Sequence, residues 1–247
     1  MMKTAAASAV AFLIAASLCA DARAQSLAVQ RILFVGNSLT TANDLPGLVE
    51  ALARAANGPR VECHVVAFPN FSLEDHWNRG DAARAIAEGG WTAVVLQQGP
   101  SALPESRALL VDYVRRFDGA IKRAGARTAL YMVWPAAARQ SDFEGVKMSY
   151  AAAARAVDGL LLPVGEAWRG AWRRDSRIEL YDRDGLHPTP LASYLAALVI
   201  YQKLSGRSPV GMPETLTSSR GARLLVVPPV HTGLLQQAAA EANASMK

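Results

Sequence analysis

Cysteine is scarce in this chain of 247 residues, which contains only Cys19 and Cys63. Cys19 lies in an N-terminal segment that we expect to be cleaved, so Cys63 would be left without a partner for an intramolecular disulfide. Cys63 lies in an apolar stretch with the character of a strand, where a free cysteine usually behaves as a small hydrophobic side chain. The sequence therefore argues against a disulfide scaffold and favours a structural role for Cys63.

Long apolar runs are absent after the first 25 residues, which have the layout of an export signal. Lys3 supplies the positive charge, residues 5–18 form the apolar region, and Ala22-Arg23-Ala24 provides small residues for cleavage. We expect cleavage after Ala24, giving a signal peptide over residues 1–24 and one domain over residues 25–247. The apolar run is short and rich in alanine, so we expect a periplasmic or secreted protein without stable membrane insertion.

Runs of basic residues are also missing, although the formal net charge is +5. Lysine and arginine are scattered among acidic residues and are not interleaved with aromatics, so the sequence gives no support for a nucleic-acid partner. None of the four histidines shares a metal-ligand spacing with another histidine and a carboxylate. We therefore expect neither a metal nor another cofactor.

The chain does contain short apolar runs that alternate with helical periodicity. Strands are expected at residues 31–35, 60–67, 91–96, 128–133 and 160–164, and helices at residues 45–52, 73–88, 109–124, 147–159, 189–204 and 231–244. The alternation predicts an α/β fold, a three-layer αβα sandwich around a five-stranded parallel sheet. Ligands of such sheets bind beyond the carboxyl ends of the strands, so the loops with Ser38, Asn70 and Gln97-Gln98 should share one edge.

The turn Gly36-Asn37-Ser38-Leu39-Thr40 lies between the first strand and the helix that follows. A serine in this position is either a nucleophile or part of an anion-binding turn, because the backbone N–H groups at a helix start are free. A nucleophilic serine needs a base, and the base needs an orienting acid. The segment Asp184-Gly185-Leu186-His187-Pro188 can supply both, since its Asp and His can face inward together.

The Gly36–Thr40 turn and the Asp184–Pro188 segment, in this order on an α/β pattern, resemble the SGNH (GDSL-type) hydrolase family. This resemblance implies the flavodoxin-like SGNH hydrolase fold from about residue 31 to residue 204. It also implies that Ser38 is the nucleophile, that His187 is the general base and then the acid, and that Asp184 orients His187.

By the same resemblance, the oxyanion hole consists of the Ser38 N–H, a backbone N–H of the second block and a side-chain amide of the third. The second block, residues 68–77, has Asn70 where the family has glycine, which implies an unusual backbone angle. The third block has Gln97 and Gln98 where the family has asparagine. We expect Gln97 rather than Gln98 to be the donor, because a glutamine amide can donate as an asparagine does.

These residues predict an exported serine esterase that works through an acyl-enzyme, with a small-molecule or carbohydrate ester as substrate. The alternative is a non-catalytic binding or scaffold protein on the same fold, whose Gly36–Thr40 turn binds an anion. The other histidines fit structural roles, with His64 in a strand and His76 on a helix surface. Trp134 fits core packing and pocket lining equally well. The sequence does not determine the acyl group or the alcohol of the substrate, nor the oligomeric state.

Overall fold

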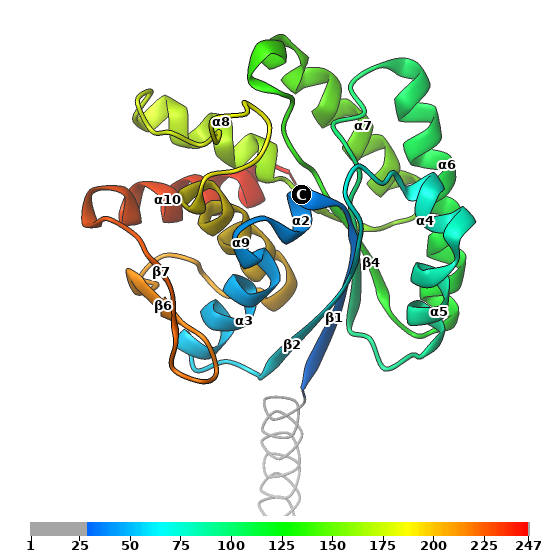
Figure 1. Ribbon diagram of the computed structural model, residues 1–247, viewed down its shortest axis with the longest axis horizontal. Helices are drawn as coiled ribbons and strands as arrows, with labels where there is room; N and C mark the ends of the chain where they lie inside the picture. Colours follow the sequence, from blue (N-terminus) through cyan, green and yellow to red (C-terminus); the bar gives the residue numbers. More distant parts are fainter. Residues whose placement is uncertain (1–28, 247) are drawn as a thin grey trace, which may run out of the picture.

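A computed structural model describes residues 29–246, and the expected signal peptide lies outside them. Its centre is a parallel sheet with strand order β2-β1-β3-β4-β5 (Figure 1), which confirms the predicted fold class. The strands are β1 (Gln30–Gly36), β2 (Val61–Ala67), β3 (Ala93–Leu96), β4 (Arg127–Tyr131) and β5 (Leu160–Leu162). The chain leaves β1 toward β2 and returns to β3 on the other side, so the carboxyl ends of β1 and β3 flank the switch point where such sheets bind ligands.

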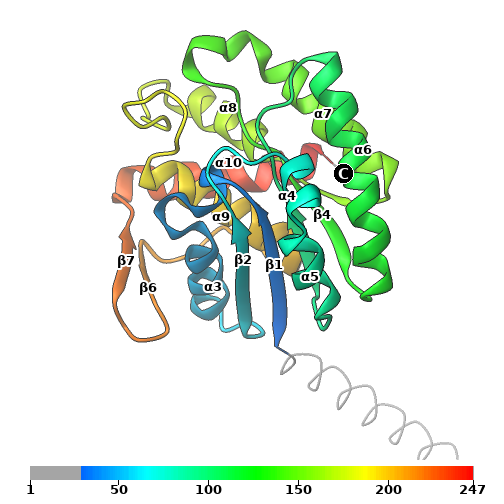
Figure 2. The same cartoon turned by 45° about the vertical axis from the view of Figure 1, so that its right-hand side comes forward.

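Helices cover both faces of the sheet (Figures 1 and 2). One face carries α3 (Leu45–Ala55), α8 (Val164–Arg174), α9 (Pro190–Ser205) and α10 (Pro229–Ser245). The other carries α4 (Leu73–Arg79), α5 (Asp81–Ala87), α6 (Pro104–Arg123) and α7 (Phe143–Ala156). Because helices lie on both sides, the central strands are buried along most of their length, as Phe34, Val94 and Leu130 illustrate with no exposed surface.

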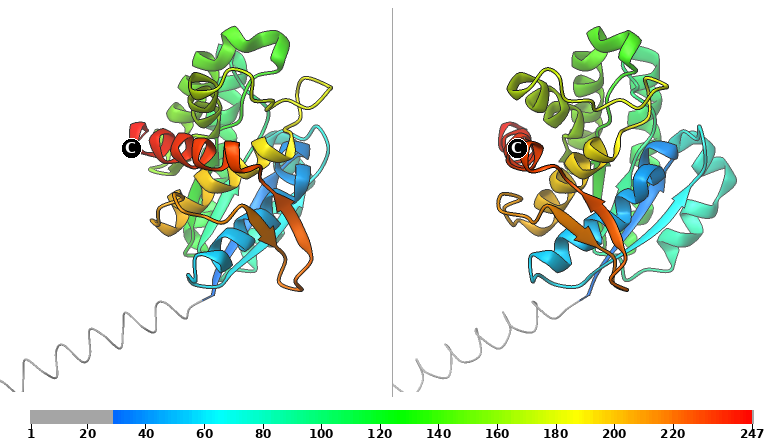
Figure 3. Two further views of the ribbon diagram at one scale, coloured as in Figure 1. Left: turned by 90° about the vertical axis from the view of Figure 1, so that its left-hand side faces the viewer. Right: turned by 60° about the vertical axis from the view of Figure 1, so that its left-hand side comes forward.

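Two segments differ from the sequence prediction. The helix expected over residues 73–88 is divided into α4 and α5 at Gly80, whose φ of 85° ends α4 in the left-handed conformation. The tail after α9 contains an antiparallel hairpin, β6 (Thr215–Thr217) and β7 (Arg223–Val226), which the Gly- and Pro-rich sequence did not reveal. Figure 3 shows this hairpin beside α3, away from the ligand-binding edge of the sheet. No helix within residues 29–246 is long and apolar enough to cross a bilayer.

Candidate active site

The serine turn is shaped by a side-chain cap. β1 ends at Gly36, and the short helix α2 (Ser38–Thr41) begins immediately after Asn37. The Asn37 Oδ1 atom accepts a hydrogen bond from the Leu39 N–H at 3.1 Å, which is the usual role of an N-cap residue. Ser38 is therefore the first residue of a helix, and no hydrogen bond within residues 29–246 uses its N–H.

The Asp184–Pro188 loop brings an acid and a base to this serine. The Asp184 Oδ1 atom accepts from the N–H groups of Leu186 and His187, each at 2.9 Å, and this holds the turn. Its Oδ2 atom lies 2.5 Å from His187 Nδ1, and His187 Nε2 lies 2.9 Å from Ser38 Oγ. A carboxylate can only accept, so Nδ1 carries the proton and Nε2 is free to accept from the serine hydroxyl. The structure thus joins the three predicted catalytic residues in one hydrogen-bonded chain.

Asp184 stays ionised in this arrangement. The hydrogen bond from His187, followed by those from the backbone N–H groups of Leu186 and His187, lowers the pKa of the Asp184 carboxyl to about 2. The carboxylate therefore remains available to orient the imidazole and to stabilise it when it takes up a proton.

Buried groups support the histidine loop from beneath. The Trp134 indole N–H donates to the Leu186 carbonyl at 2.9 Å, and the Trp134 ring stacks on Trp168 with centroids 3.8 Å apart. A backbone bond of 2.8 Å from Ala137 N–H to the Gly185 carbonyl adds a second attachment. Trp134 has no exposed surface, so of its two possible roles the structure favours packing, here beneath the site.

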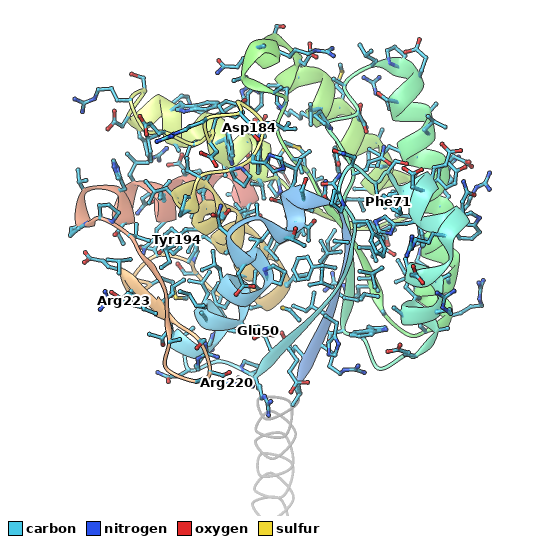
Figure 4. All side chains as sticks on the ribbon, in the orientation of Figure 1. Glu50, Phe71, Asp184, Tyr194, Arg220 and Arg223 are labelled. Carbon is cyan, nitrogen blue, oxygen red and sulfur yellow. The ribbon has the colours of Figure 1, made fainter. Side chains whose placement is uncertain are left out.

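A pocket of about 420 Å³ opens beside Ser38. Figure 4 shows Phe71 and Asp184 on opposite sides of α2 at the same end of the sheet, and the loops that carry them border the site. The wall includes Asn70, Phe71, Gln98, Leu109 and Leu186. It therefore combines a few polar groups with apolar surface, as ligand sites usually do.

Asn70 occupies the backbone conformation that its position requires. The Phe71 N–H donates to the Phe68 carbonyl at 3.2 Å, and Asn70 has a φ of 63°. Proline at the second position and asparagine with positive φ at the third are typical of a type II β-turn. No hydrogen bond among the described residues uses the Asn70 N–H, so this group is available at the pocket wall.

Gln97 does not line the pocket, so the prediction that it donates to an oxyanion is wrong. Its side chain has no exposed surface, and its Oε1 atom accepts from the Asn37 N–H at 2.9 Å and the Thr40 hydroxyl at 2.7 Å. Its Nε2 atom donates to the Gln98 carbonyl at 2.7 Å. The amide is buried beneath α2 and away from the pocket, where its oxygen holds the serine turn onto β3.

Gln98 faces the pocket instead. Its Oε1 atom accepts from the Leu73 N–H at 3.0 Å, and its Nε2 atom donates to the Ser101 hydroxyl at 2.8 Å. A primary amide nitrogen carries two hydrogens, so one N–H remains for a ligand. Gln98, rather than Gln97, is the glutamine positioned to meet a substrate.

The sequence prediction for His76 is wrong. His76 was expected on a helix surface, but it is fully buried, and its Nε2 donates to the Gly36 carbonyl at 2.7 Å. Burial lowers the pKa of the His76 imidazole, which favours the neutral form beneath the serine turn. Its spacing of three from Leu73 on one helix face was a signal for burial.

The remaining candidate groups do not form a second reactive centre. Burial raises the pKa of the Cys63 thiol, which opposes formation of the nucleophilic thiolate. Within residues 29–246, no three His, Cys, Asp or Glu side chains are grouped closely enough to hold a metal ion.

Comparison with known proteins identifies the family, although no family model and no curated protein matches the chain. A solved structure assigned to the SGNH hydrolases, from Slackia heliotrinireducens, is 31% identical. The match covers 72% of this chain and 100% of that one, with a TM-score of 0.61. The chain therefore belongs to the SGNH hydrolase family, and this membership supports a hydrolytic function.

Two further structures share the fold at lower identity. A DUF4886 family protein from Bacteroides uniformis is 19% identical with a TM-score of 0.69, covering 87% of this chain and 95% of its own. The lipase/acylhydrolase from Enterococcus faecalis is 17% identical with a TM-score of 0.58, covering 72% and 96%. Both structures therefore have the same fold as this chain.

Proposed function

We propose that this protein is an exported serine esterase that cleaves carboxylic esters by acyl transfer. The observation that carries the proposal is a continuous series of hydrogen bonds from Ser38 through His187 to Asp184. Ser38 Oγ lies 2.9 Å from His187 Nε2, and His187 Nδ1 lies 2.5 Å from Asp184 Oδ2. A serine hydroxyl is a weak nucleophile until a base removes its proton, and this chain supplies such a base in the required tautomer.

In the first step, Ser38 Oγ attacks the ester carbonyl while His187 Nε2 takes the hydroxyl proton. The carbonyl oxygen becomes an oxyanion, and Asp184 stabilises the imidazolium that forms. Collapse of this intermediate breaks the bond to the alcohol oxygen, which leaves with the proton from His187. In the second step, water attacks the acyl-Ser38 ester with His187 again as base, releasing the acid and restoring the enzyme.

We assign the oxyanion to three donors at the pocket wall, the N–H groups of Ser38 and Asn70 and the free Nε2–H of Gln98. All three residues line the pocket, and the two backbone groups have no other acceptor within residues 29–246. Donors fixed before the reaction stabilise developing charge more strongly than mobile water does.

Hydrolysis of short p-nitrophenyl esters, with acetylated xylan and acylated peptidoglycan fragments as polymer substrates, tests this proposal. Ser38→Ala and His187→Ala should each lower kcat by at least about 10⁴-fold while the thermal unfolding temperature changes little. A folded wild-type protein that hydrolyses none of these esters would favour the alternative, a binding protein on the same fold. Cleavage after Ala24, read by N-terminal sequencing of periplasmic material, tests the export signal.

A further inference from the structure

The pocket beside Ser38 has free hydrogen-bond donors at the end where the ester carbonyl would bind. These are the N–H groups of Ser38 and Asn70 and the second hydrogen of the Gln98 amide. They gather around α2 and the carboxyl ends of β1 and β3. A carbonyl oxygen, which only accepts, is complementary to this end.

Apart from Ser38, the serine hydroxyls of the pocket wall cannot add donors elsewhere. Each of the three carries one hydrogen, and each hydrogen is already donated to another group of the protein. The donations run from Ser72 to Asp75 Oδ2 at 2.7 Å, from Ser101 to the Gly99 carbonyl at 3.1 Å and from Ser106 to the Leu103 carbonyl at 3.0 Å. Toward a ligand, these hydroxyls can act only as acceptors.

Glu74 places a carboxylate on the side of the pocket formed by α4 and α6. Its Oε1 atom accepts from the Tyr113 hydroxyl of α6 at 2.7 Å, and no hydrogen bond of the described residues uses its Oε2 atom. It is the single charged side chain among the described residues that line the pocket. Arg116 of α6 lies 4.8 Å from the Tyr113 ring centroid but pairs with Asp112, and Arg107 donates to Ser149, so neither arginine forms an ion pair with Glu74.

We propose that the pocket, with donors near Ser38 and acceptors near Glu74, selects among esters by the end opposite the reacting carbonyl. It favours esters in which that end is cationic or otherwise donates hydrogen bonds, and it rejects esters in which that end is anionic. The inference rests on the proposed function, because the donor end is assigned to the ester carbonyl. The wall near Glu74 offers acceptors and one negative charge that has no ion-pair partner among the described residues, so an anionic group there loses its hydration and meets repulsion. Glu74 is therefore the specificity-determining residue of the pocket.

Esters that share the reacting group and differ in the charge at the opposite end test the proposal. One series places the charge on the alcohol: acetylcholine, neutral 3,3-dimethylbutyl acetate and anionic 3-acetoxypropanoate. The other places it on the acyl group, with p-nitrophenyl esters of 4-(trimethylammonio)butanoic, pentanoic and glutaric acids. In at least one series we expect kcat/KM for the cationic ester to exceed that for the anionic ester by about tenfold.

Glu74→Gln should reduce this ratio to about one, whereas Glu105→Gln should preserve it. Glu105 is an exposed residue of α6 that does not line the pocket, so its substitution removes the same charge without changing the wall. A ratio near one in the wild type, or an unchanged ratio in Glu74→Gln, would overturn the inference.

Binding separates this inference from the proposed function. Failure to hydrolyse the neutral esters would count against the esterase proposal, and calorimetry on Ser38→Ala would still test the pocket with the same esters. Tighter binding of the cationic than of the anionic ester supports the role of Glu74, and equal affinities contradict it.

Discussion

The histidine loop and the glutamine loop meet at the same serine, but they are held in place in different ways. The loop with Asp184 and His187 is supported by groups outside it, including the Trp134 indole and the Ala137 N–H. The loop after β3 also has an outside support, the Tyr150 hydroxyl, but it is attached in addition through one of its own side chains, the Gln97 amide, which reaches under α2. One of two adjacent glutamines therefore has a structural role, and the other is left to face the pocket.

The difference between Gln97 and Gln98 follows from strand geometry. Successive side chains of an extended chain point to opposite sides, and this alternation continues past Leu96 at the end of β3. Gln97 consequently lies beneath the serine turn, whereas Gln98 points toward the loop that carries Asn70. Neighbours of identical chemistry can thus have separate functions.

Of the two glutamines, Gln98 should have the larger effect on turnover when it is substituted. Because Gln98→Ala removes one of the proposed oxyanion donors, we expect kcat to fall by about 10²- to 10³-fold. Steady-state hydrolysis of a p-nitrophenyl ester measures this loss. The unfolding temperature should fall by about 2–6 °C, because the buried Leu73 N–H loses its acceptor at about 1–3 kcal/mol, whereas the Ser101 hydroxyl keeps its bond to the Gly99 carbonyl.

Gln97→Ala should mainly lower the stability of the fold. It leaves the buried Asn37 N–H and Thr40 hydroxyl without their acceptor, at about 1–3 kcal/mol for each unsatisfied group. We expect the unfolding temperature in differential scanning calorimetry to fall by about 4–12 °C. If Gln97→Ala instead retains full stability while losing turnover, and Gln98→Ala keeps its activity, the two assignments are reversed.

Gly36→Ala should test how closely the serine turn packs on Thr40 and Gln97. An added Cβ at Gly36 would lie 2.3 Å from Thr40 Oγ1 and 2.4 Å from Gln97 Oε1, so it would displace the buried bonds at about 1–3 kcal/mol. Chemical denaturation measures the change in the free energy of unfolding. Gly233→Ala in α10 is the matched control: it meets nothing within 4 Å and should be neutral or slightly stabilising. Equal tolerance at both positions would contradict the crowding at Gly36.

The smallest effect concerns the Asp184 carboxyl and pH. Its pKa is lowered to about 2 in the folded protein, from about 4 in an unfolded chain, so its contribution to stability is present above about pH 4 and is lost as the pH falls toward 2. The difference in unfolding temperature between wild type and Asp184→Asn should therefore narrow on acidification from about pH 5 to about pH 2.5. A difference that widens over this range would show that the pKa is not lowered.

Much of the fold was predictable because the sheet is buried on both faces. The β-branched and aromatic run of residues 31–35 and the apolar run of residues 91–96 show directly that β1 and β3 are internal strands. The division between α4 and α5 was not predictable from periodicity, since it depends on the positive φ of Gly80. The β6–β7 hairpin was also missed, because its short strands pair only with each other and pack beside α3.

The candidate site was predictable where a motif joins residue type to position. The Gly36–Thr40 and Asp184–Pro188 segments placed the three hydrogen-bonded residues, and Asn70 at the family's glycine position correctly implied an unusual backbone angle. The choice between Gln97 and Gln98 failed because the motif records an amide but not the side of the strand from which it projects. Burial of His76 depends on packing across the serine turn, which sequence spacing suggests but does not establish.

Covalent labelling tests whether Ser38 is the nucleophile. The wild-type protein is incubated with a fluorophosphonate, and the modified residue is located by mass spectrometry of the digested protein. We predict one phosphonate adduct per chain on the peptide that contains Ser38, and no adduct on folded Ser38→Ala. A folded wild-type protein that remains unlabelled, or an adduct that persists in Ser38→Ala, would contradict the account.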